Sequence, residues 1–276
     1  MLSSRNNVKI VATILAKNEE DIIGRTIEHH ISQGVSQFIV TDNASNDRTR
    51  SIIEKYPEVV EIIDEREDDH NQSKWVTRMA RMACKLKPDW IIHLDADELW
   101  CGLSSLRGVK SNYIGSTKML LHPPSLGEMR HYLDFSNIPS FKEECKVAHR
   151  PDESIQITHG NHGFHGISHI EFTKKIWRHH YPVRSYSQFV KKALGHESLI
   201  KRNSICERWK NWYDLHTQGK LEELYNSICK YWQSMIASPN KEDLIKLLEF
   251  WSPKEVIDFF EKNNVLPEIG EWPKEL

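Results

Sequence analysis

The sequence predicts an α/β protein: a mainly parallel, Rossmann-like sheet flanked by helices, with a helical C-terminal extension. Two observations predict this fold. The first hundred residues alternate between short apolar, β-branched runs and segments with apolar residues at helical spacing, whereas after Tyr186 only helical spacing remains. Each pair of parallel strands needs a crossover that covers one face of the sheet, so the alternation favours a doubly wound arrangement.

The elements of the first hundred residues can be justified in order. Isoleucines at helical spacing from Ile22 to Ile31 predict a helix that Gly34 ends, and Pro57 stops a short helix that follows a turn-forming cluster at 43–47. Apolar residues from Trp75 to Leu86 share one helical face, with basic residues opposite them. In chain order we predict a strand at 9–15, a helix at 19–33, a strand at 37–41, a helix at 47–56, a strand at 59–63, a helix around 74–86 and a buried strand at 90–94.

The remainder of the chain is predicted in less detail. From Cys101 to about Glu171 the periodicity fades into a stretch rich in Pro, Gly, Ser and His, where we expect loops and short strands. Tryptophans at 209, 212 and 232 are the expected packing anchors of the C-terminal helices, predicted at 188–194, 206–215, 221–235, 241–251 and 253–262. We therefore expect a catalytic, nucleotide-sugar-binding domain over 1–197 and a helical extension over 198–276.

Composition and charge exclude several classes of protein. Of the 276 residues, 39% are hydrophobic and 28% are charged, which is typical of a folded globular protein. The formal net charge of -2 provides no global positive field, so no nucleic-acid partner is expected.

Cysteine usage and apolar runs suggest a compartment. The five cysteines show no CxxC pair and no framework spacing, which favours reduced thiols in the cytoplasm. The apolar run at 8–15 is too short to cross a bilayer, and no run approaches about 18 apolar residues. We expect no membrane span, and peripheral attachment through a partner stays open.

An acidic cluster follows the fourth predicted strand. Its carboxylates are Asp95, Asp97 and Glu98, with Ala96 between the first two, and it comes directly after an apolar run. Clustered carboxylates repel one another unless a cation neutralises them, and Mg²⁺ or Mn²⁺ typically takes one or two carboxylates plus substrate phosphate oxygens. Such an ion would offset charge on a nucleoside-diphosphate leaving group. The alternative is a solvated turn or a helix cap.

A second polar cluster follows the second predicted strand. Asp42 stands where an acid can accept hydrogen bonds from a base or a ribose, and Asn46 or Asp47 is suited to cap the next helix. Glycine-rich phosphate loops of the GxGxxG and GxxxxGK[ST] types are absent from the sequence, which argues against ordinary dehydrogenases and P-loop enzymes. Because ligands of open α/β sheets bind beyond the carboxyl ends of the strands, we expect these polar clusters to share one crevice.

Blocks spread over residues 8–197 resemble the family 2-like glycosyltransferases with the GT-A fold, and the downstream blocks look like the subgroup allied to family 92 transferases. The upstream blocks are AKNEE at 16–20, the Gly34-Val35 pair, DNASNDRT at 42–49, Gln72 with Trp75, and DWIIHLDADE at 89–98; the downstream blocks are KVAHRP at 146–151, GNH at 160–162 and HYPVRSYSQF at 180–189.

The resemblance implies a function and a set of site residues. It implies transfer of a sugar from a UDP- or GDP-linked donor to a hydroxyl acceptor on a glycan or glycolipid, with inversion and with Mn²⁺ or Mg²⁺. Asp95, Asp97 and His180 are the implied metal ligands. The implied nucleotide-sugar contacts are Asn18, Glu19, Asp42, Gln72, Trp75, Arg78, Asp95, Ala96, Arg184 and Lys191, although Arg78 also belongs to the basic helical face and fits solvent exposure equally well.

The general base is not identified by the sequence. An inverting transferase needs a group that takes the proton of the acceptor hydroxyl. Besides Asp97 in the acidic motif, His162, Glu144 and Asp152 are the catalytic candidates, with Glu143 and Glu153 beside them. The easily recognised Glu-Asp pair of many family 2 enzymes is not apparent here, which leaves the base open.

Three alternative functions share some features with this sequence. A metallophosphoesterase is suggested by Gly160-Asn161-His162, but position 163 is Gly where that class has an acid, and the companion GDxxD motif is absent from the sequence. A nucleotidyltransferase would have a basic, glycine-rich nucleotide loop near the first strand, and this sequence has none there. A catalytically silent sugar-binding scaffold would not need three candidate metal ligands.

Overall fold

The computed structural model describes residues 8–65, 71–124, 131–135, 145–167, 169–195, 197, 207–250, 254–263 and 266–271. The chain divides into two compact units, which are described separately. The first, here called the sheet unit, comprises Met1–Lys118 and Glu144–Arg178. The second, the helical unit, comprises Met119–Glu143 and His179–Leu276.

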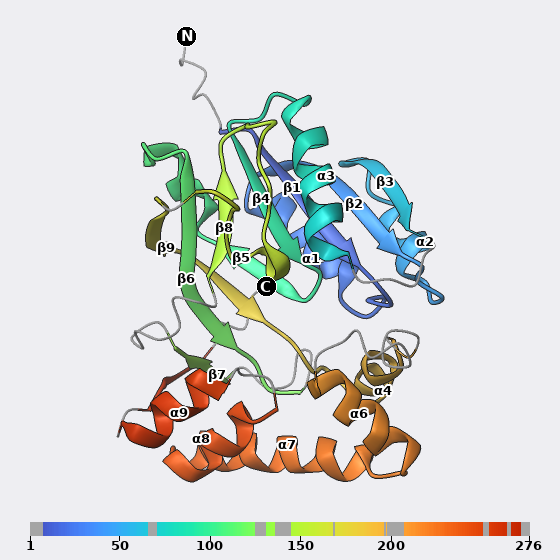
Figure 1. Ribbon diagram of the computed structural model, residues 1–276, viewed down its shortest axis with the longest axis vertical. Helices are drawn as coiled ribbons and strands as arrows, with labels where there is room; N and C mark the ends of the chain where they lie inside the picture. Colours follow the sequence, from blue (N-terminus) through green and yellow to red (C-terminus); the bar gives the residue numbers. More distant parts are fainter. Residues whose placement is uncertain are drawn as a thin grey trace. The chain divides into compact units, whose positions relative to one another are not determined.

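Four parallel strands form the first part of the sheet unit, in the order β4-β1-β2-β3 (Figure 1). They alternate with helices in the chain, as the sequence predicts. Their bounds are β1 (Ile10–Ala16), β2 (Val35–Asn43), β3 (Val59–Glu65) and β4 (Trp90–Asp95), and the helices between them are α1 (Ile23–Ser32), α2 (Thr49–Ile53) and α3 (Gln72–Cys84).

The strands beyond β4 correct the expectation of a mainly parallel sheet. There β8 (Lys146–His149) runs antiparallel to β4, and the first half of β6 (Tyr113–Leu121) runs antiparallel to β8. A short strand, β5 (Glu98–Cys101), pairs with β9 (Glu171–His180). The sheet is therefore mixed, because the strands that follow β5 in the chain add to it in antiparallel pairs. The sequence of this part of the chain is polar and has little periodicity, so it does not predict these strands. Two 3₁₀ turns, η1 (Leu103–Gly108) and η3 (His159–Asn161), complete the unit.

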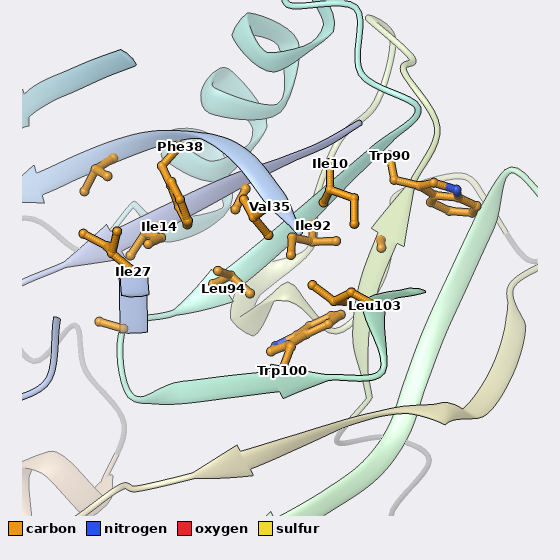
Figure 2. Packing of buried hydrophobic residues seen from close by; sticks show 14 of the residues in the cluster. Ile10, Ile14, Ile27, Val35, Phe38, Trp90, Ile92, Leu94, Trp100 and Leu103 are labelled. Carbon is orange, nitrogen blue, oxygen red and sulfur yellow. The ribbon is translucent and has the colours of Figure 1, made fainter. Parts of the chain in front are cut away.

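Alternation along β1 explains why helices cover both faces of the sheet. Ile10, Ala12 and Ile14 belong to a buried cluster with residues of α1 (Figure 2), whereas Val11 packs in a separate cluster with residues of α3. Successive side chains of a strand point to opposite faces, so a strand covered on both faces reads as a continuous apolar run. This arrangement leaves the ends of the strands as the place where polar side chains gather.

The helical unit has an aromatic core. Trp212 and Trp232 are 5% and 0% exposed, as expected of packing anchors, and Trp209 packs against the same cluster. Ser185 caps α4, and Asn240 caps α8. The helices are α4 (Tyr186–Leu194), α6 (Glu207–Thr217), α7 (Leu221–Ala237), α8 (Lys241–Leu248) and α9 (Lys254–Lys262), with a small antiparallel sheet of β10 (Glu268–Glu271), β7 (His131–Asp134) and the second half of β6.

The observed units differ from the expected boundary at residue 197. By contacts, the helical unit also takes in Met119–Glu143 and the chain from His179 onward. The division of function between 1–197 and 198–276 therefore stays a proposal. None of the helices in the described part of the chain combines the length and apolar character that a membrane crossing requires.

Candidate active site

The register of the parallel strands brings the predicted acids together. Leu15 of β1 pairs with Asp95 on one side, and Ala16 pairs with Asp42 on the other. Asp95 and Asp42 therefore lie on the two strands that flank β1, at the same edge of the sheet. The convergence expected from the sequence is present for these two residues, and it follows from parallel pairing alone.

The loop after β1 is joined to the loop after β2 by hydrogen bonds. The Asn18 backbone N–H donates to Ser45 Oγ (2.9 Å), and Asn18 Oδ1 accepts from the Asn46 N–H (2.8 Å). The Glu19 N–H donates to Thr49 Oγ1 (2.8 Å). Asn18 adopts a left-handed backbone with φ of 55°, which asparagine tolerates better than most residues. These contacts hold the loop after β1 against the loop after β2, beside Asp42.

The carboxylates of Asp42 and Asp47 have different tasks. Asp47 Oδ1 accepts from the Thr49 N–H (2.9 Å), so it stabilises the start of α2 as the sequence predicts. Asp42 Oδ1 accepts one bond, from the Ser45 N–H (3.1 Å). A carboxylate offers about four acceptor positions, so Asp42 retains capacity for a hydroxyl or a base.

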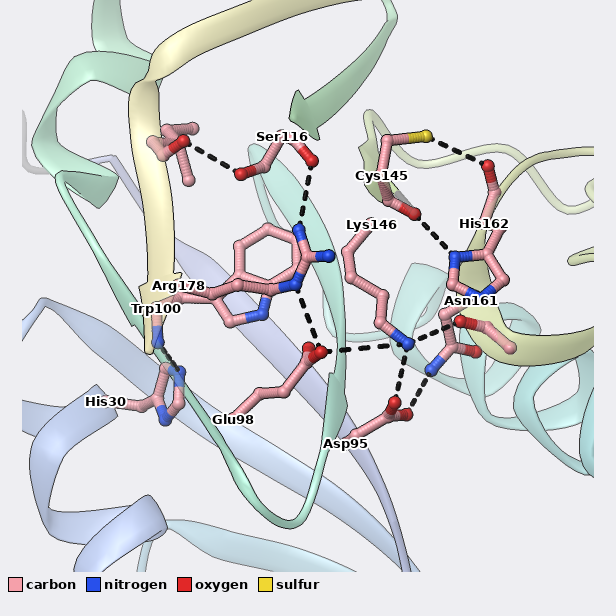
Figure 3. Close-up of polar contacts among 12 residues, drawn as sticks. His30, Asp95, Glu98, Trp100, Ser116, Cys145, Lys146, Asn161, His162 and Arg178 are labelled. Carbon is pink, nitrogen blue, oxygen red and sulfur yellow. Dashed lines mark hydrogen bonds and ion pairs between the residues drawn. The ribbon is translucent and has the colours of Figure 1, made fainter. Parts of the chain in front are cut away.

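Two donors from beyond the parallel strands hold the Asp95 carboxylate (Figure 3). Lys146 Nζ lies 2.5 Å from Asp95 Oδ2, and Asn161 Nδ2 donates to Asp95 Oδ1 at 3.0 Å. Lys146 also donates to the Gly160 carbonyl at 2.6 Å. The carboxylate therefore carries a direct ionic partner within the protein.

A second buried ion pair lies beside the first (Figure 3). Arg178 Nε donates to Glu98 Oε1 at 3.0 Å, and the side chains of Arg178 and Glu98 are 1% and 2% exposed. Lys146 Nζ is 3.9 Å from the same Glu98 oxygen. Burial lowers the pKa of Lys146, but the charges of Asp95 and Glu98 outweigh burial and raise that pKa above its ordinary value. The lysine is therefore charged at neutral pH.

Ala96 and Asp97, the next two residues of the acidic motif, are buried, at 5% and 7% exposed. The Ala96 carbonyl accepts from Thr26 Oγ1 of α1 (2.6 Å), which fixes the turn between β4 and β5. Among the described residues, no group of three His, Cys, Asp or Glu side chains forms a ready metal cage. An ion at this motif would depend on substrate oxygens for the rest of its ligands.

The predicted nucleotide contacts on α3 have protein partners of their own. Gln72 Oε1 accepts from the Gly160 N–H (3.0 Å), and Arg78 forms an ion pair with Glu65 (2.5 Å). Trp75 is 2% exposed and packs inside the unit, which leaves little of its surface for a ligand. Gln72 thus supports the turn that carries Asn161. Direct nucleotide contacts by these three residues stay predictions.

A groove of 670 Å³ runs along the exposed face of α3. Its lining contains both Gln72 and Arg78, together with the exposed basic side chains Lys74, Arg81 and Lys85, and His159 and His165 from the segment around η3. The groove therefore reaches the turn that holds Asn161.

The catalytic candidates occupy different places in the sheet unit. His162 follows Asn161 directly, and its Nδ1 lies 2.8 Å from the Cys145 carbonyl. Asp152 follows β8, whose last residue, His149, pairs with Ile91 near the start of β4. Asp95 is four residues further along β4, or about 13 Å in an extended strand, so the structure does not bring Asp152 to the acidic motif. Glu144 lies outside the described residues.

The environment of Asp152 is also unsuited to a base. Hydrogen bonds from Ser154 are the main cause that holds the pKa of Asp152 below its ordinary value, and a hydrogen bond from Tyr113 contributes less. A carboxylate with a lowered pKa is a weaker proton acceptor.

The remaining predicted residues belong to the helical unit. His180 ends β9, Arg184 is 3% exposed with its Nη1 donating to the Tyr181 carbonyl (3.1 Å), and Lys191 lies on α4. Asp95 and Asp97 belong to the sheet unit. The participation of His180, Arg184 and Lys191 in the site therefore stays a prediction.

Sequence reasoning does not identify the partners of the acids as functional residues. Lys146 and Asn161 stand in the blocks KVAHRP and GNH, Glu98 is the third acid of its motif, and no pattern marks Arg178. The available signal is a lysine at the start of a buried strand, because such a charge needs a partner.

Comparisons with known proteins bear on the parallel half of the sheet unit. Residues 12–101 match the family model described as glycosyl transferase family 2. This segment begins within β1, ends with β5 and includes the acidic motif. No curated protein sequence matches the chain.

The solved structures that resemble this chain have low sequence identity to it. Glucosyl-3-phosphoglycerate synthase from Mycobacterium tuberculosis, in complex with Mn²⁺, UDP and glucosyl-3-phosphoglycerate, is 18% identical over 40% of this chain and 43% of its own, with a TM-score of 0.31. Mannosyl-3-phosphoglycerate synthase from Rubrobacter xylanophilus is 16% identical over 52% and 53%, with a TM-score of 0.36. S. aureus TarS 1–349, in complex with UDP-GlcNAc, is 12% identical over 91% and 83%, with a TM-score of 0.45. The chain thus spans less than half of the first of these proteins.

The family match covers the part of the chain in which Asp42 and Asp95 converge on the β1 edge. It favours a glycosyltransferase over the metallophosphoesterase and nucleotidyltransferase alternatives. The subgroup allied to family 92 is not tested by it. The match and the α/β architecture together support a family 2-like glycosyltransferase with a GT-A-like fold.

Proposed function

We propose that this chain transfers a sugar from a UDP- or GDP-linked donor to a hydroxyl group of a glycan or glycolipid, with inversion at the anomeric carbon and with Mn²⁺ or Mg²⁺ as cofactor. One observation carries the proposal. Asp42 and Asp95 flank the end of β1 within the segment that matches glycosyl transferase family 2. Ligands of such sheets bind at the carboxyl ends of the strands.

Asp95 and Asp97 would hold the ion, with His180 as a third protein ligand. The donor set suits a hard divalent cation, because Mg²⁺ and Mn²⁺ accept one or two carboxylates and complete their shell with substrate phosphate oxygens and water. Each Asp95 oxygen accepts one protein hydrogen bond, so lone pairs are left for an ion. When bound, the ion supplies positive charge that offsets the diphosphate leaving group.

The nucleotide would lie over β1 and β2. Asp42 is suited to accept hydrogen bonds from the base or ribose, and the loop of Asn18 and Glu19 is bonded to the loop that follows Asp42. Arg184 and Lys191 are proposed contacts of the diphosphate or the acceptor. We propose a reducing, cytoplasmic compartment, in which the thiols of Cys84, Cys101, Cys145 and Cys229 stay reduced.

We propose His162 as the base that takes the acceptor proton. The Cys145 carbonyl can only accept, so His162 Nδ1 carries the hydrogen and Nε2 is the basic nitrogen. Gly160, with φ of 72°, permits the close approach, since a Cβ there would lie 2.4 Å from His162 Nε2. With an acceptor in hand, His162→Gln should lower kcat by about 10²- to 10⁴-fold and remove the acidic limb of the pH profile. An unchanged profile would eliminate His162.

The proposal is tested by donor binding, which needs no knowledge of the acceptor. UDP and GDP are titrated by calorimetry with and without Mn²⁺ into wild type, Asp97→Ala and Asp89→Ala. The control, Asp89, precedes β4 at its other end, where it accepts from the Lys9 N–H (2.7 Å). We expect metal-dependent binding of one nucleotide in wild type and Asp89→Ala, and loss of that binding in Asp97→Ala. Absence of binding by wild type under all conditions would refute the proposal.

A further inference from the structure

Lys146 occupies an unusual position for a buried lysine. Its side chain is 5% exposed, and its ammonium contacts the first acid of the proposed metal motif and the Gly160 carbonyl. In the antiparallel register of β8 on β4, Ile91 pairs with His149. If this register is continued, Lys146 lies beside Leu94, one residue before Asp95. The contact is therefore set by strand pairing, and not by a flexible surface side chain.

The charges around Lys146 balance without a metal ion. Asp95 and Glu98 contribute two negative charges, and Lys146 and Arg178 contribute two positive charges, all within one set of contacts (Figure 3). Each cation is held further by a carbonyl: Gly160 for Lys146 and Ser116 for Arg178. The carboxylates of Asp95 and Glu98 therefore have their neutralising charges within the protein, and Asp97 is the acid of the motif that this count does not include.

We propose that Lys146 is a positioning residue that holds Asp95 and sets the metal affinity of the acidic motif. The ammonium neutralises Asp95 and repels a divalent ion approaching the same carboxylate. The ion binds strongly only together with a nucleoside diphosphate, whose negative charge offsets the added cation. Donor and metal thus bind as a pair, which limits occupation by metal alone. The inference rests on the proposed assignment of the ion to Asp95 and Asp97.

The test measures Mn²⁺ binding without nucleotide, from the electron paramagnetic resonance signal of free Mn²⁺. The variants Lys146→Met and Lys146→Gln both remove the charge, and Gln keeps a donor for Asp95 or Gly160. Lys146→Arg retains the charge. Lys85→Met is the matched control, since Lys85 is an exposed lysine directly after α3. We expect Mn²⁺ to bind at least about tenfold more tightly to Lys146→Met and Lys146→Gln, with wild-type affinity in Lys146→Arg and Lys85→Met.

A second titration adds UDP or GDP. We expect the nucleotide to tighten Mn²⁺ binding in wild type, and to tighten it less in Lys146→Gln, whose site already binds the ion. Equal or weaker Mn²⁺ binding in the two charge-removing variants would overturn the inference. If Lys146→Met does not fold, as judged by circular dichroism, Lys146→Gln decides the outcome.

Failure of this inference can be told apart from failure of the proposed function. Nucleotide binding by wild type with equal Mn²⁺ affinity in all variants would overturn the role of Lys146 and leave the transferase proposal standing. The opposite outcome is tighter Mn²⁺ binding in Lys146→Gln with no nucleotide binding by wild type. It would support the effect of Lys146 on metal affinity and refute the proposed donor binding.

Discussion

The parallel strands and the segment from β8 to η3 contribute to the site in different ways. The parallel strands supply the acids Asp42 and Asp95 through a register that neighbouring elements determine. The β8–η3 segment supplies Lys146 and Asn161, which meet Asp95 across 51 and 66 residues of sequence. The comparison teaches that the charge of a motif is set as much by a distant strand as by the strand that carries it.

The largest expected effect is on the buried pair of Glu98 and Arg178. Glu98→Ala leaves Arg178 without its buried carboxylate, so we expect the free energy of unfolding in urea to fall by about 3 to 5 kcal/mol. The control is Glu54→Ala, which breaks a partly exposed pair with Arg50 and should cost less than about 1 kcal/mol. Equal losses in the two variants would show that the Glu98 cluster is not an effective low-dielectric site.

The next effect links the two regions through pH. His93 of β4 stacks on His149 of β8, with ring centroids 5.2 Å apart. Burial lowers the pKa of His149 to about 4 and that of His93 well below its ordinary value. A pKa lowered in the folded state gives stability that is complete above the unfolded value of about 6.5 and is lost as pH falls toward the folded value.

For His149 this loss amounts to about 2 kcal/mol between pH 7 and pH 5. We expect the unfolding free energy of wild type to fall over this range, and that of His149→Gln to fall by about 2 kcal/mol less. Urea titrations at the two pH values provide the measurement. Parallel pH profiles for the two proteins would mean that His149 is not buried as a neutral side chain.

The smallest effect is the difference of about 1 kcal/mol between two variants of Asn161, which separates backbone strain from a hydrogen bond. Asn161 has φ of 60° and donates to Asp95. Asn161→Gly loses the charge-assisted bond and should destabilise the protein by about 1.5 to 3 kcal/mol. Asn161→Ala loses the same bond and also places Ala in the left-handed region, which adds about 1 kcal/mol. Equal unfolding free energies of the two variants would rule out the strain.

The elements of the parallel half were predictable because their signals are local. The helix predicted at 19–33 is observed at Ile23–Ser32, and the strand predicted at 90–94 at Trp90–Asp95. Apolar periodicity and turn residues are read within a few positions. The five C-terminal helices were predicted for the same reason.

The antiparallel strands and the cations were not predictable in the same way. The long strand β6 lies in the stretch where we expect loops and short strands, and the long strand β9 begins where that stretch ends. The pairing of Lys146 with Asp95 depends on the register of β8 on β4, which no local pattern specifies. The motif DxD could be found by reading the sequence, whereas its neutralisation by Lys146 required the fold.

The central claim is that the edge formed by β4, β1 and β2 binds the nucleotide of the donor. The most direct test is a crystal structure of the chain with Mn²⁺ and whichever of UDP or GDP it binds. We predict density for the nucleotide beside Asp42, with Mn²⁺ between its diphosphate and Asp97. A nucleotide bound away from this edge, with Asp42 and Asp97 untouched, would contradict the claim.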